Sequence, residues 1–167
     1  MKHFLLVLVS LLITSQNFAQ EKPSNYFDFW IGSWDVTWTY ADGSPGKGTN
    51  EITKVLDGSV IQENFVGLEG AYKGFKGISI SVYNQAQDKW YQTWQDNQGG
   101  NINLTGEFDG DKRIFRTALV EANGQRIYSR MVFYDIKKDS FTWDWEQTTD
   151  GGETWTLNWR INYKRRS

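Results

Sequence analysis

The feature that most constrains the fold is an alternation of apolar and polar residues, repeated in ten short segments along the chain. The last segment, "TWTLNWRINYK" (residues 154–164), places an apolar side chain at every second position. Successive side chains of a β-strand point to opposite faces of its sheet, so such a segment has one apolar face and one polar face. No stretch after residue 19 has the apolar spacing of an amphipathic helix. The segments predicted as strands are residues 33–41, 49–56, 59–66, 75–83, 89–96, 101–108, 113–120, 126–136, 140–147 and 154–164.

Short polar links between these segments indicate how the strands connect. "DG" at 57–58, "DNQGG" at 96–100 and "NG" at 123–124 are typical of tight hairpin turns. None of the links is long enough for a crossover helix, so consecutive strands are expected to pair antiparallel. The sequence therefore predicts an all-β fold, a single antiparallel meander that closes into a barrel of about 8–10 strands around one core.

The N-terminal residues 1–19 have the pattern of a secretory signal peptide. Lys2 precedes an apolar run at 4–13 that is too short to span a bilayer, and Ala19 is a small residue suited to the cleavage position. A retained anchor helix is the alternative interpretation. We expect a signal peptide at 1–19 and one barrel domain at 20–167, exported to the periplasm or secreted, with no further membrane span.

Composition narrows the chemistry of this domain. The chain has no Cys, and its single histidine, His3, lies within the expected signal peptide. The domain therefore has no Ser-His-Asp or Cys-His nucleophile, no His-ligated zinc and no haem held by His or Cys. A net charge of −2 gives no electrostatic footprint for nucleic acid. We predict no nucleic-acid partner, no cofactor and no metal, since "DNQGG" and "DGD" (109–111) are more typical of hairpin turns than of calcium loops.

The chain has nine tryptophans, which can fill a wide barrel interior or line a cavity within it, and both interpretations stay open. Polar residues share faces with the rings: Gln92 and Asp96 with Trp94, and Glu63 with Phe65. A buried carboxylate is costly unless it is paired or binds a ligand. Arginines on adjacent strands could neutralise such carboxylates. The predicted ligand-binding residues are Glu63, Tyr83, Gln92, Trp94, Asp96, Arg116, Arg130, Trp143 and Trp145.

These polar residues admit three interpretations: a structural ion-pair network, a polar rim that orients a ligand, and general acid–base catalysis by paired carboxylates such as Glu63 and Asp96. The hypothesis we favour is an exported protein that binds a small apolar or amphipathic molecule in an aromatic-lined interior. One alternative is an isomerase, lyase or hydrolase that uses carboxylate chemistry in the same cavity. Another is a carbohydrate-contacting module with exposed aromatic rings. We expect a binding protein rather than an enzyme.

Gly32 and Trp34, after the aromatic lead-in "FDFW" (27–30), resemble the Gly-x-Trp signature of the lipocalin and calycin superfamily. The resemblance implies that a short 3₁₀ turn plugs one end of the barrel and that the tryptophan stacks beneath a basic residue of the last strand. Arg160 is the candidate for that residue, with Lys164 and Arg165 as alternates.

Two longer segments extend this resemblance. "VIQENF" (60–65) and "KWYQTWQDNQGGNINLTGEF" (89–108), with the Trp-rich C-terminal end, are similar to the lipocalin-like family catalogued as domain of unknown function 1579. The resemblance covers residues 20–167. It implies a lipocalin-like barrel and carries no activity with it.

"TTDGGETW" (148–155) resembles a single Asp-box. Thr148, Asp150, Gly152, Thr154 and Trp155 match the motif position for position. The resemblance implies a hairpin in which Asp150 caps turn N–H groups, Gly152 adopts a positive φ and Trp155 packs beneath. A single copy without repeats indicates a structural role rather than glycosidase activity.

Overall fold

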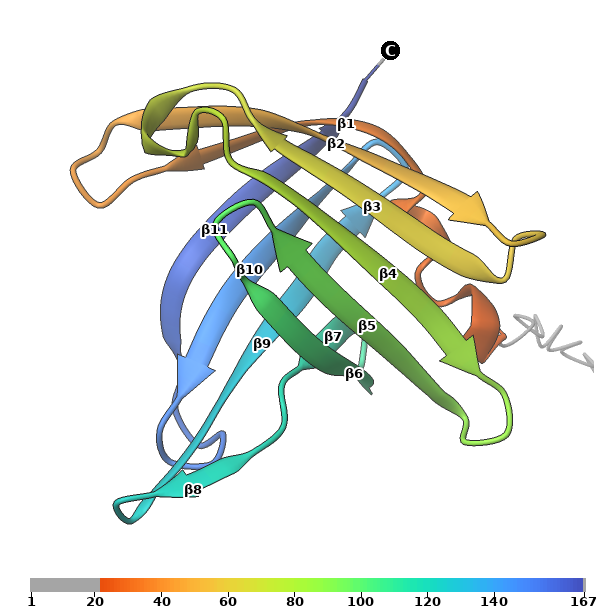
Figure 1. Cartoon of the computed structure of the whole chain (residues 1–167), viewed down its shortest axis with the longest axis vertical. Helices are drawn as coiled ribbons and strands as arrows, with labels where there is room; N and C mark the ends of the chain where they lie inside the picture. Colours follow the sequence, from red (N-terminus) through yellow and green to blue (C-terminus); the bar gives the residue numbers. More distant parts are fainter. Residues whose placement is uncertain (1–21, 167) are drawn as a thin grey trace, which may run out of the picture.

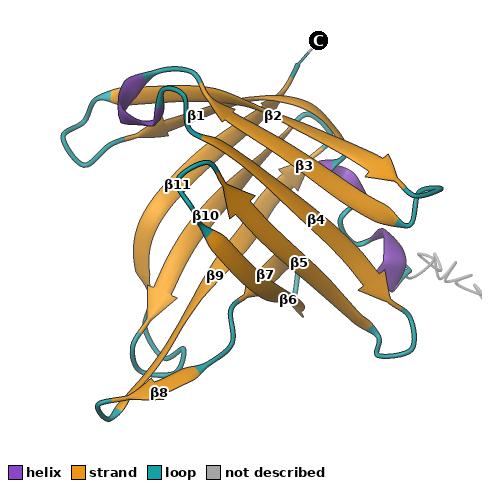
Figure 2. Ribbon diagram, in the orientation of Figure 1, coloured by secondary structure: helices purple, strands orange, loops and turns teal. Residues whose placement is uncertain are grey.

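The computed structural model describes residues 22–166, so the predicted signal peptide lies outside the described residues. Strands make up most of the described chain, and three short 3₁₀ helices lie at the two ends of the barrel (Figure 2). The strands are β1 Gly32–Thr39, β2 Pro45–Val55, β3 Val60–Gly67, β4 Lys76–Asn84, β5 Lys89–Asp96, β6 Asn101–Asp109, β7 Lys112–Arg116, β8 Val120–Ala122, β9 Gln125–Lys137, β10 Ser140–Thr148 and β11 Thr156–Arg165. The 3₁₀ helices are η1 Pro23–Asn25, η2 Asp28–Trp30 and η3 Gly70–Tyr72.

Ten of these strands form one closed antiparallel barrel (Figure 1). Each strand from β1 to β6 pairs with the next, β7 pairs with β9, and the pairings β9–β10, β10–β11 and β11–β1 complete the ring. The remaining strand, β8, pairs only with β9 and projects from the barrel. The predicted all-β meander barrel, lipocalin-like in architecture, is confirmed.

The prediction of one strand over residues 113–120 is wrong. Strand β7 ends at Arg116, and β8 begins only at Val120. Beyond the barrel rim, the chain turns back at Asn123 and Gly124, and β8 pairs with the protruding part of β9. The Asn-Gly turn is therefore a hairpin outside the barrel wall.

One end of the barrel is filled by the aromatic lead-in and is called the closed end below. The Phe27 ring stacks on that of Phe115 at 4.4 Å between centroids, and Trp30 meets Phe133 edge-on at 5.3 Å. Phe27 and Trp30 are almost fully buried. The opposite end, called the open end, carries the links 40–44, 68–75, 97–100 and 149–155.

Contacts between Gly32, Trp34 and Arg165 stabilise the closed end. The indole N–H of Trp34 donates to the carbonyl of Trp30 at 2.8 Å, and the Arg165 guanidinium lies 4.1 Å from the centroid of the Trp34 ring. Arg165 also donates to the carbonyl of Ile31 at 2.9 Å. Gly32 has a φ of +134°, and a Cβ there would lie 2.2 Å from Arg165 Nη1, so only glycine fits.

The basic residue above Trp34 is thus the alternate Arg165, and the prediction of Arg160 is wrong. Ile161 and Tyr163 point inward from β11, and alternation gives the same side to Arg165 and the opposite side to Arg160. On the outer face Arg160 donates two hydrogen bonds, of 2.8 and 2.6 Å, to the carboxylate of Asp144.

Candidate functional site

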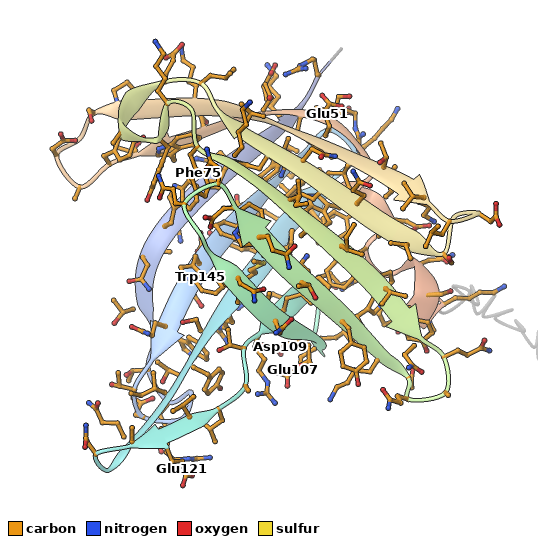
Figure 3. All side chains as sticks on the ribbon, viewed as in Figure 1. Glu51, Phe75, Glu107, Asp109, Glu121 and Trp145 are labelled. Carbon is orange, nitrogen blue, oxygen red and sulfur yellow. The ribbon has the colours of Figure 1, made fainter. Side chains whose placement is uncertain are left out.

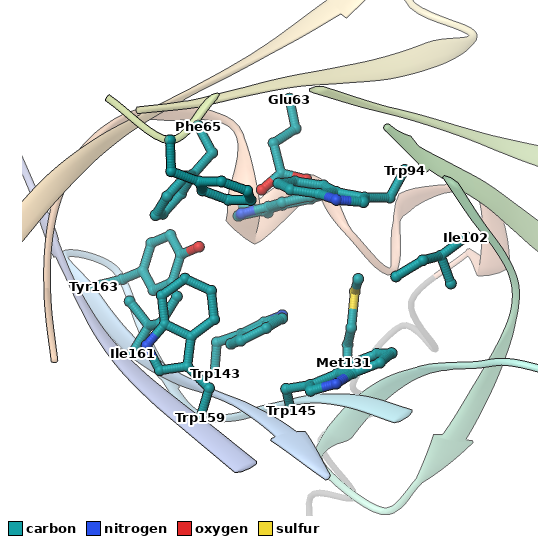
Figure 4. A pocket seen from close by; sticks show the side chains of 12 residues that line it. Glu63, Phe65, Trp94, Ile102, Met131, Trp143, Trp145, Trp159, Ile161 and Tyr163 are labelled. Carbon is teal, nitrogen blue, oxygen red and sulfur yellow. The ribbon is translucent and has the colours of Figure 1, made fainter. Parts of the chain in front are cut away.

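The half of the barrel towards the open end contains a cavity of about 140 Å³, partly open to solvent. Figure 4 shows Glu63, Phe65 and Trp94 on one side of it and Met131, Trp143 and Trp145 on the other. Trp30 separates it from the packed closed end. The lining residues are Trp30, Glu63, Phe65, Phe75, Trp94, Ile102, Met131, Trp143, Trp145, Trp159, Ile161 and Tyr163.

Strand β4 leaves the space for this cavity, because its inward residues are small. Ser79 and Ser81 are fully buried, whereas Ile78 and Ile80, which alternate with them, face outward and are 47% and 39% exposed. This reverses the usual placement of apolar side chains. A bulkier inward set would fill the volume in front of Met131 on β9 and of the rings on β10 and β11.

Glu63, on β3, is the one carboxylate that residues 22–166 contribute to the cavity wall. Its Oε1 accepts a hydrogen bond of 2.6 Å from Asn50 Nδ2, and its Oε2 accepts one of 2.6 Å from Ser79 Oγ. Burial raises the pKa of Glu63 from 4.5 to about 7, although these two hydrogen bonds act in the opposite direction. Asn50 Nδ2 also donates to the hydroxyl of Tyr163 at 3.1 Å, and burial, with the nearby Glu63 carboxyl, raises the Tyr163 pKa well above its usual value of 10.0.

Two indole N–H groups of the cavity residues lack an acceptor. Within residues 22–166, no hydrogen bond reaches Nε1 of Trp30 or Nε1 of Trp159. The same is true of two oxygens in the wall around Glu63, Asn50 Oδ1 and Gln92 Oε1. Buried polar groups are almost always hydrogen-bonded in native proteins, so four unpartnered atoms on residues in and beside the cavity wall are unusual.

Four of the predicted ligand-binding residues line the cavity: Glu63, Trp94, Trp143 and Trp145. The cavity thus brings together residues of β3, β5 and β10, which lie far apart in the sequence.

Gln92, Tyr83 and Asp96 lie elsewhere. Gln92 is buried, and its Nε2 donates to Ser81 Oγ at 2.9 Å within the wall. The Tyr83 hydroxyl donates to Asp88 near the closed end.

Asp96 lies at the open end, where it stabilises its own turn. Its Oδ1 accepts from the backbone N–H groups of Gln98 and Gly100 at 2.9 Å each, and its Oδ2 from Trp94 Nε1 at 3.2 Å. Burial would raise the Asp96 pKa, but these hydrogen bonds together lower it. Glu63 is among the described residues that line the cavity and Asp96 is not, so the two carboxylates considered for catalysis do not share the cavity wall.

Arg116 and Arg130 do not neutralise Glu63, contrary to the expectation that they would pair with a buried interior carboxylate. Their chain neighbours Phe115 and Met131 are buried in the interior, so both arginines lie on the outer face. Arg116 pairs with Glu107, and Arg130 pairs with Glu146 at 2.7 Å.

Several cavity residues were absent from the predicted ligand-binding set although they lie on inward strand faces, among them Phe65 on β3 and Trp159, Ile161 and Tyr163 on β11. Asn50 and Ser79 complete the surroundings of Glu63, and Tyr163 lies above them. Alternation could have found Asn50, because it lies two residues from the inward Ile52 on β2. No sequence pattern indicated that Trp30 of the closed end also forms the floor of a cavity.

The turn at 149–155 is held by Asp150. Its Oδ1 accepts from the backbone N–H groups of Gly152, Glu153 and Thr154 at 3.2, 2.9 and 3.1 Å. Side-chain hydrogen bonds from Thr148 and Thr154, with backbone ones, hold the Asp150 pKa far below its usual value. Gly152 has a φ of +102° and its carbonyl accepts from Trp155 Nε1 at 3.1 Å.

Trp155 therefore precedes β11 and lies outside the barrel, where the Arg130 guanidinium is 3.5 Å from its ring centroid. The last segment was expected to place Trp155 on the inward face with Trp159, and this is wrong. Because Trp155 belongs to the turn, the strand alternation does not extend to it.

No protein-family model matches the chain, and no curated protein matches it. In the part of the chain that the structure describes, no helix has the length and apolar character needed to cross a membrane.

Proposed function

We propose that this protein is exported and binds a small, partly apolar molecule in the cavity of its barrel. The observation that carries the proposal is the cavity itself, a space surrounded by aromatic rings with one carboxyl group in its wall. Binding sites for small molecules are mostly apolar and contain a few convergent polar groups that orient the ligand. The rings supply the apolar surface, and Glu63 with the indole N–H groups of Trp30 and Trp159 supplies the polar one.

The volume sets the size of the ligand. An apolar protein cavity of about 150 Å³ accommodates benzene, so a cavity of about 140 Å³ suits a ligand of one ring or a short branched chain. Entry is from the open end, where Phe75 and Trp145 are partly exposed (Figure 3).

The carbohydrate-contacting alternative has less support. It requires a row of tryptophans on the surface, whereas each of the nine is buried or partly buried. The enzyme alternative would rest on Glu63 alone, since Asp96 is engaged in its own turn.

Three further proposals rest on resemblance and sequence pattern. Export to the periplasm or secretion follows from the signal-peptide pattern of residues 1–19. Membership of the lipocalin-like family catalogued as domain of unknown function 1579 is supported by the barrel architecture. An Asp-box at 148–155, acting only as a structural hairpin, is supported by the hydrogen bonds of Asp150.

Titration calorimetry with a panel of single-ring compounds tests the binding proposal. The variant Ile102→Phe adds a ring to the cavity wall, whereas Ile80→Phe makes the same change on the exposed outer face of β4. We expect Ile102→Phe to weaken binding by about tenfold or more, because added volume excludes the ligand, and Ile80→Phe to leave it within about twofold of wild type. Equal affinities for wild type and both variants would place the ligand outside the cavity and refute the proposal.

A further inference from the structure

The cavity contains a buried carboxyl group that has only neutral partners. Within the described residues, the groups facing Glu63 are Asn50 from β2, Ser79 from β4 and Tyr163 from β11. Of these partners only Tyr163 titrates, and its raised pKa keeps it neutral. No Lys or Arg is among the lining residues of the described chain. A carboxylate buried among neutral partners is costly in its charged form, and a cation inside the barrel would remove that cost.

A purely structural role at this position would not need a charge. Elsewhere in the barrel wall, Gln92 of β5 is buried, and its amide donates a hydrogen bond to Ser81 of β4. A glutamine at position 63 would retain both contacts, because the hydroxyl of Ser79 can accept a hydrogen bond as well as donate one. The acid therefore adds a capacity for charge that the packing of the wall does not require.

Aromatic rings flank this carboxyl group. In the strand register Glu63 lies opposite Ser79, and Ser79 lies opposite Trp94, so Trp94 is on the same level two strands away. Phe65 follows two residues along β3 on the same inward face. Figure 4 shows Trp143 across the cavity from Glu63. The faces of aromatic rings attract cations, and they do so most strongly where water is excluded.

We infer that the ligand of this cavity is a small organic ammonium ion, whose charged nitrogen pairs with the Glu63 carboxylate while its apolar body lies among the surrounding rings. This inference rests on the proposed function and assigns its ligand a chemical class. The size of the cavity limits the ligand to about six to ten non-hydrogen atoms, by comparison with the cavity of about 150 Å³ that accommodates benzene. The unpartnered indole N–H groups of Trp30 and Trp159 would donate hydrogen bonds to a hydroxyl or carbonyl oxygen on such an ion.

Binding of a cation must be linked to ionisation of Glu63. The pKa of Glu63 is about 7, so at lower pH the group is protonated and cannot balance a positive charge. The affinity for an ammonium ion should therefore rise about tenfold per pH unit towards this value and level off above it. A neutral compound of the same shape should show no such dependence.

The test compares benzylamine with benzyl alcohol, which has the same ring and side-chain length but no charge, and with benzoate, which is an anion. Titration calorimetry on the full domain at about pH 8 is expected to show benzylamine binding about tenfold or more tightly than benzyl alcohol, and benzoate binding most weakly. Lowering the pH to about 5.5 should remove the advantage of benzylamine, which itself stays protonated over this range.

Glu63→Gln should bind benzylamine and benzyl alcohol equally, while Glu121→Gln, a matched change on the exposed strand β8, should behave like wild type. The comparison of ligands and pH in the unmutated protein holds whether or not Glu63→Gln folds.

Binding of benzyl alcohol as tight as that of benzylamine, or a preference for benzoate, would overturn the ammonium inference and leave the binding function intact. Failure of all three compounds, and of the wider ring panel, would overturn the binding function itself.

Discussion

Raising the pH should destabilise the folded protein through the carboxyl group of Glu63. In the unfolded chain this group ionises near its ordinary pKa of 4.5, whereas burial holds its pKa at about 7 in the barrel. Between these two values the folded state retains a proton that the unfolded state has released. The free energy of unfolding therefore falls as the pH rises through this window: the stabilisation is complete below 4.5 and is lost as the pH passes about 7.

The magnitude follows from the two pKa values. A difference of about 2.5 pH units, at about 1.4 kcal/mol for each, amounts to about 3 kcal/mol. For a domain of this size, that corresponds to a fall of roughly 6 to 12 °C in Tm. No histidine of the predicted mature domain titrates in this pH window, because the one histidine of the sequence is His3 in the predicted signal peptide.

Urea denaturation from about pH 5 to about pH 8, followed by tryptophan fluorescence on protein without a histidine tag, measures this change. Glu63→Gln should have a nearly constant free energy of unfolding and should be more stable than wild type at the upper end. Glu121, on the projecting strand β8 (Figure 3), provides the control: Glu121→Gln should retain the wild-type slope. A flat wild-type profile, or a Glu63→Gln profile as steep as that of wild type, would refute the assignment of a raised pKa to Glu63.

Three further predictions concern the stability of the closed end, of the turn at 149–155 and of the packing between β4 and β5. Arg165→Gln should lower the free energy of unfolding by about 2 kcal/mol, because Trp34 loses its cation and backbone carbonyls lose their donor; urea denaturation measures this, and an unchanged midpoint would contradict it. Asp150→Ala should accelerate amide hydrogen exchange in its turn, since three N–H groups lose their acceptor, and unaltered protection there would show that the turn does not depend on Asp150. Gly77→Ala should cost about 1–3 kcal/mol, because its Cβ would lie 2.0 Å from the ring of Trp94; a variant of wild-type stability would mean that the ring moves without strain.

The alternation of the sequence was sufficient to predict the barrel and nearly all of its strands. Each strand carries one apolar face, and the links between strands are short, so a closed meander is the arrangement that buries every apolar face. The same alternation correctly placed Trp94, Trp143 and Glu63 on inward faces. It failed over residues 113–120, because the point at which a strand leaves the barrel depends on the length of its neighbour.

The partners of each charged side chain could not be predicted in this way. Alternation gives the face of a residue but not the depth to which it is buried or the strand that it meets across the barrel. Arg116 and Arg130 were therefore expected inside, whereas each pairs with a glutamate on an adjacent strand of the outer face. Alternation separates Arg160 from Arg165, because they lie on opposite faces of β11. It does not show that Arg165 lies opposite Trp34, which is fixed by the register of the closing pair β1–β11.

The sequence by itself determined the fold class, because the spacing of apolar side chains is a local property that the backbone of a strand converts directly into two faces. Only the tertiary structure decided where the interior stays hollow. Closure of the ring placed the small residues of β4 opposite the large side chains of β9–β11, and it left Glu63 in the space between them with neutral neighbours. That space arises from contacts between strands distant in sequence, since packing volume depends on all the side chains that meet there and not on any one segment.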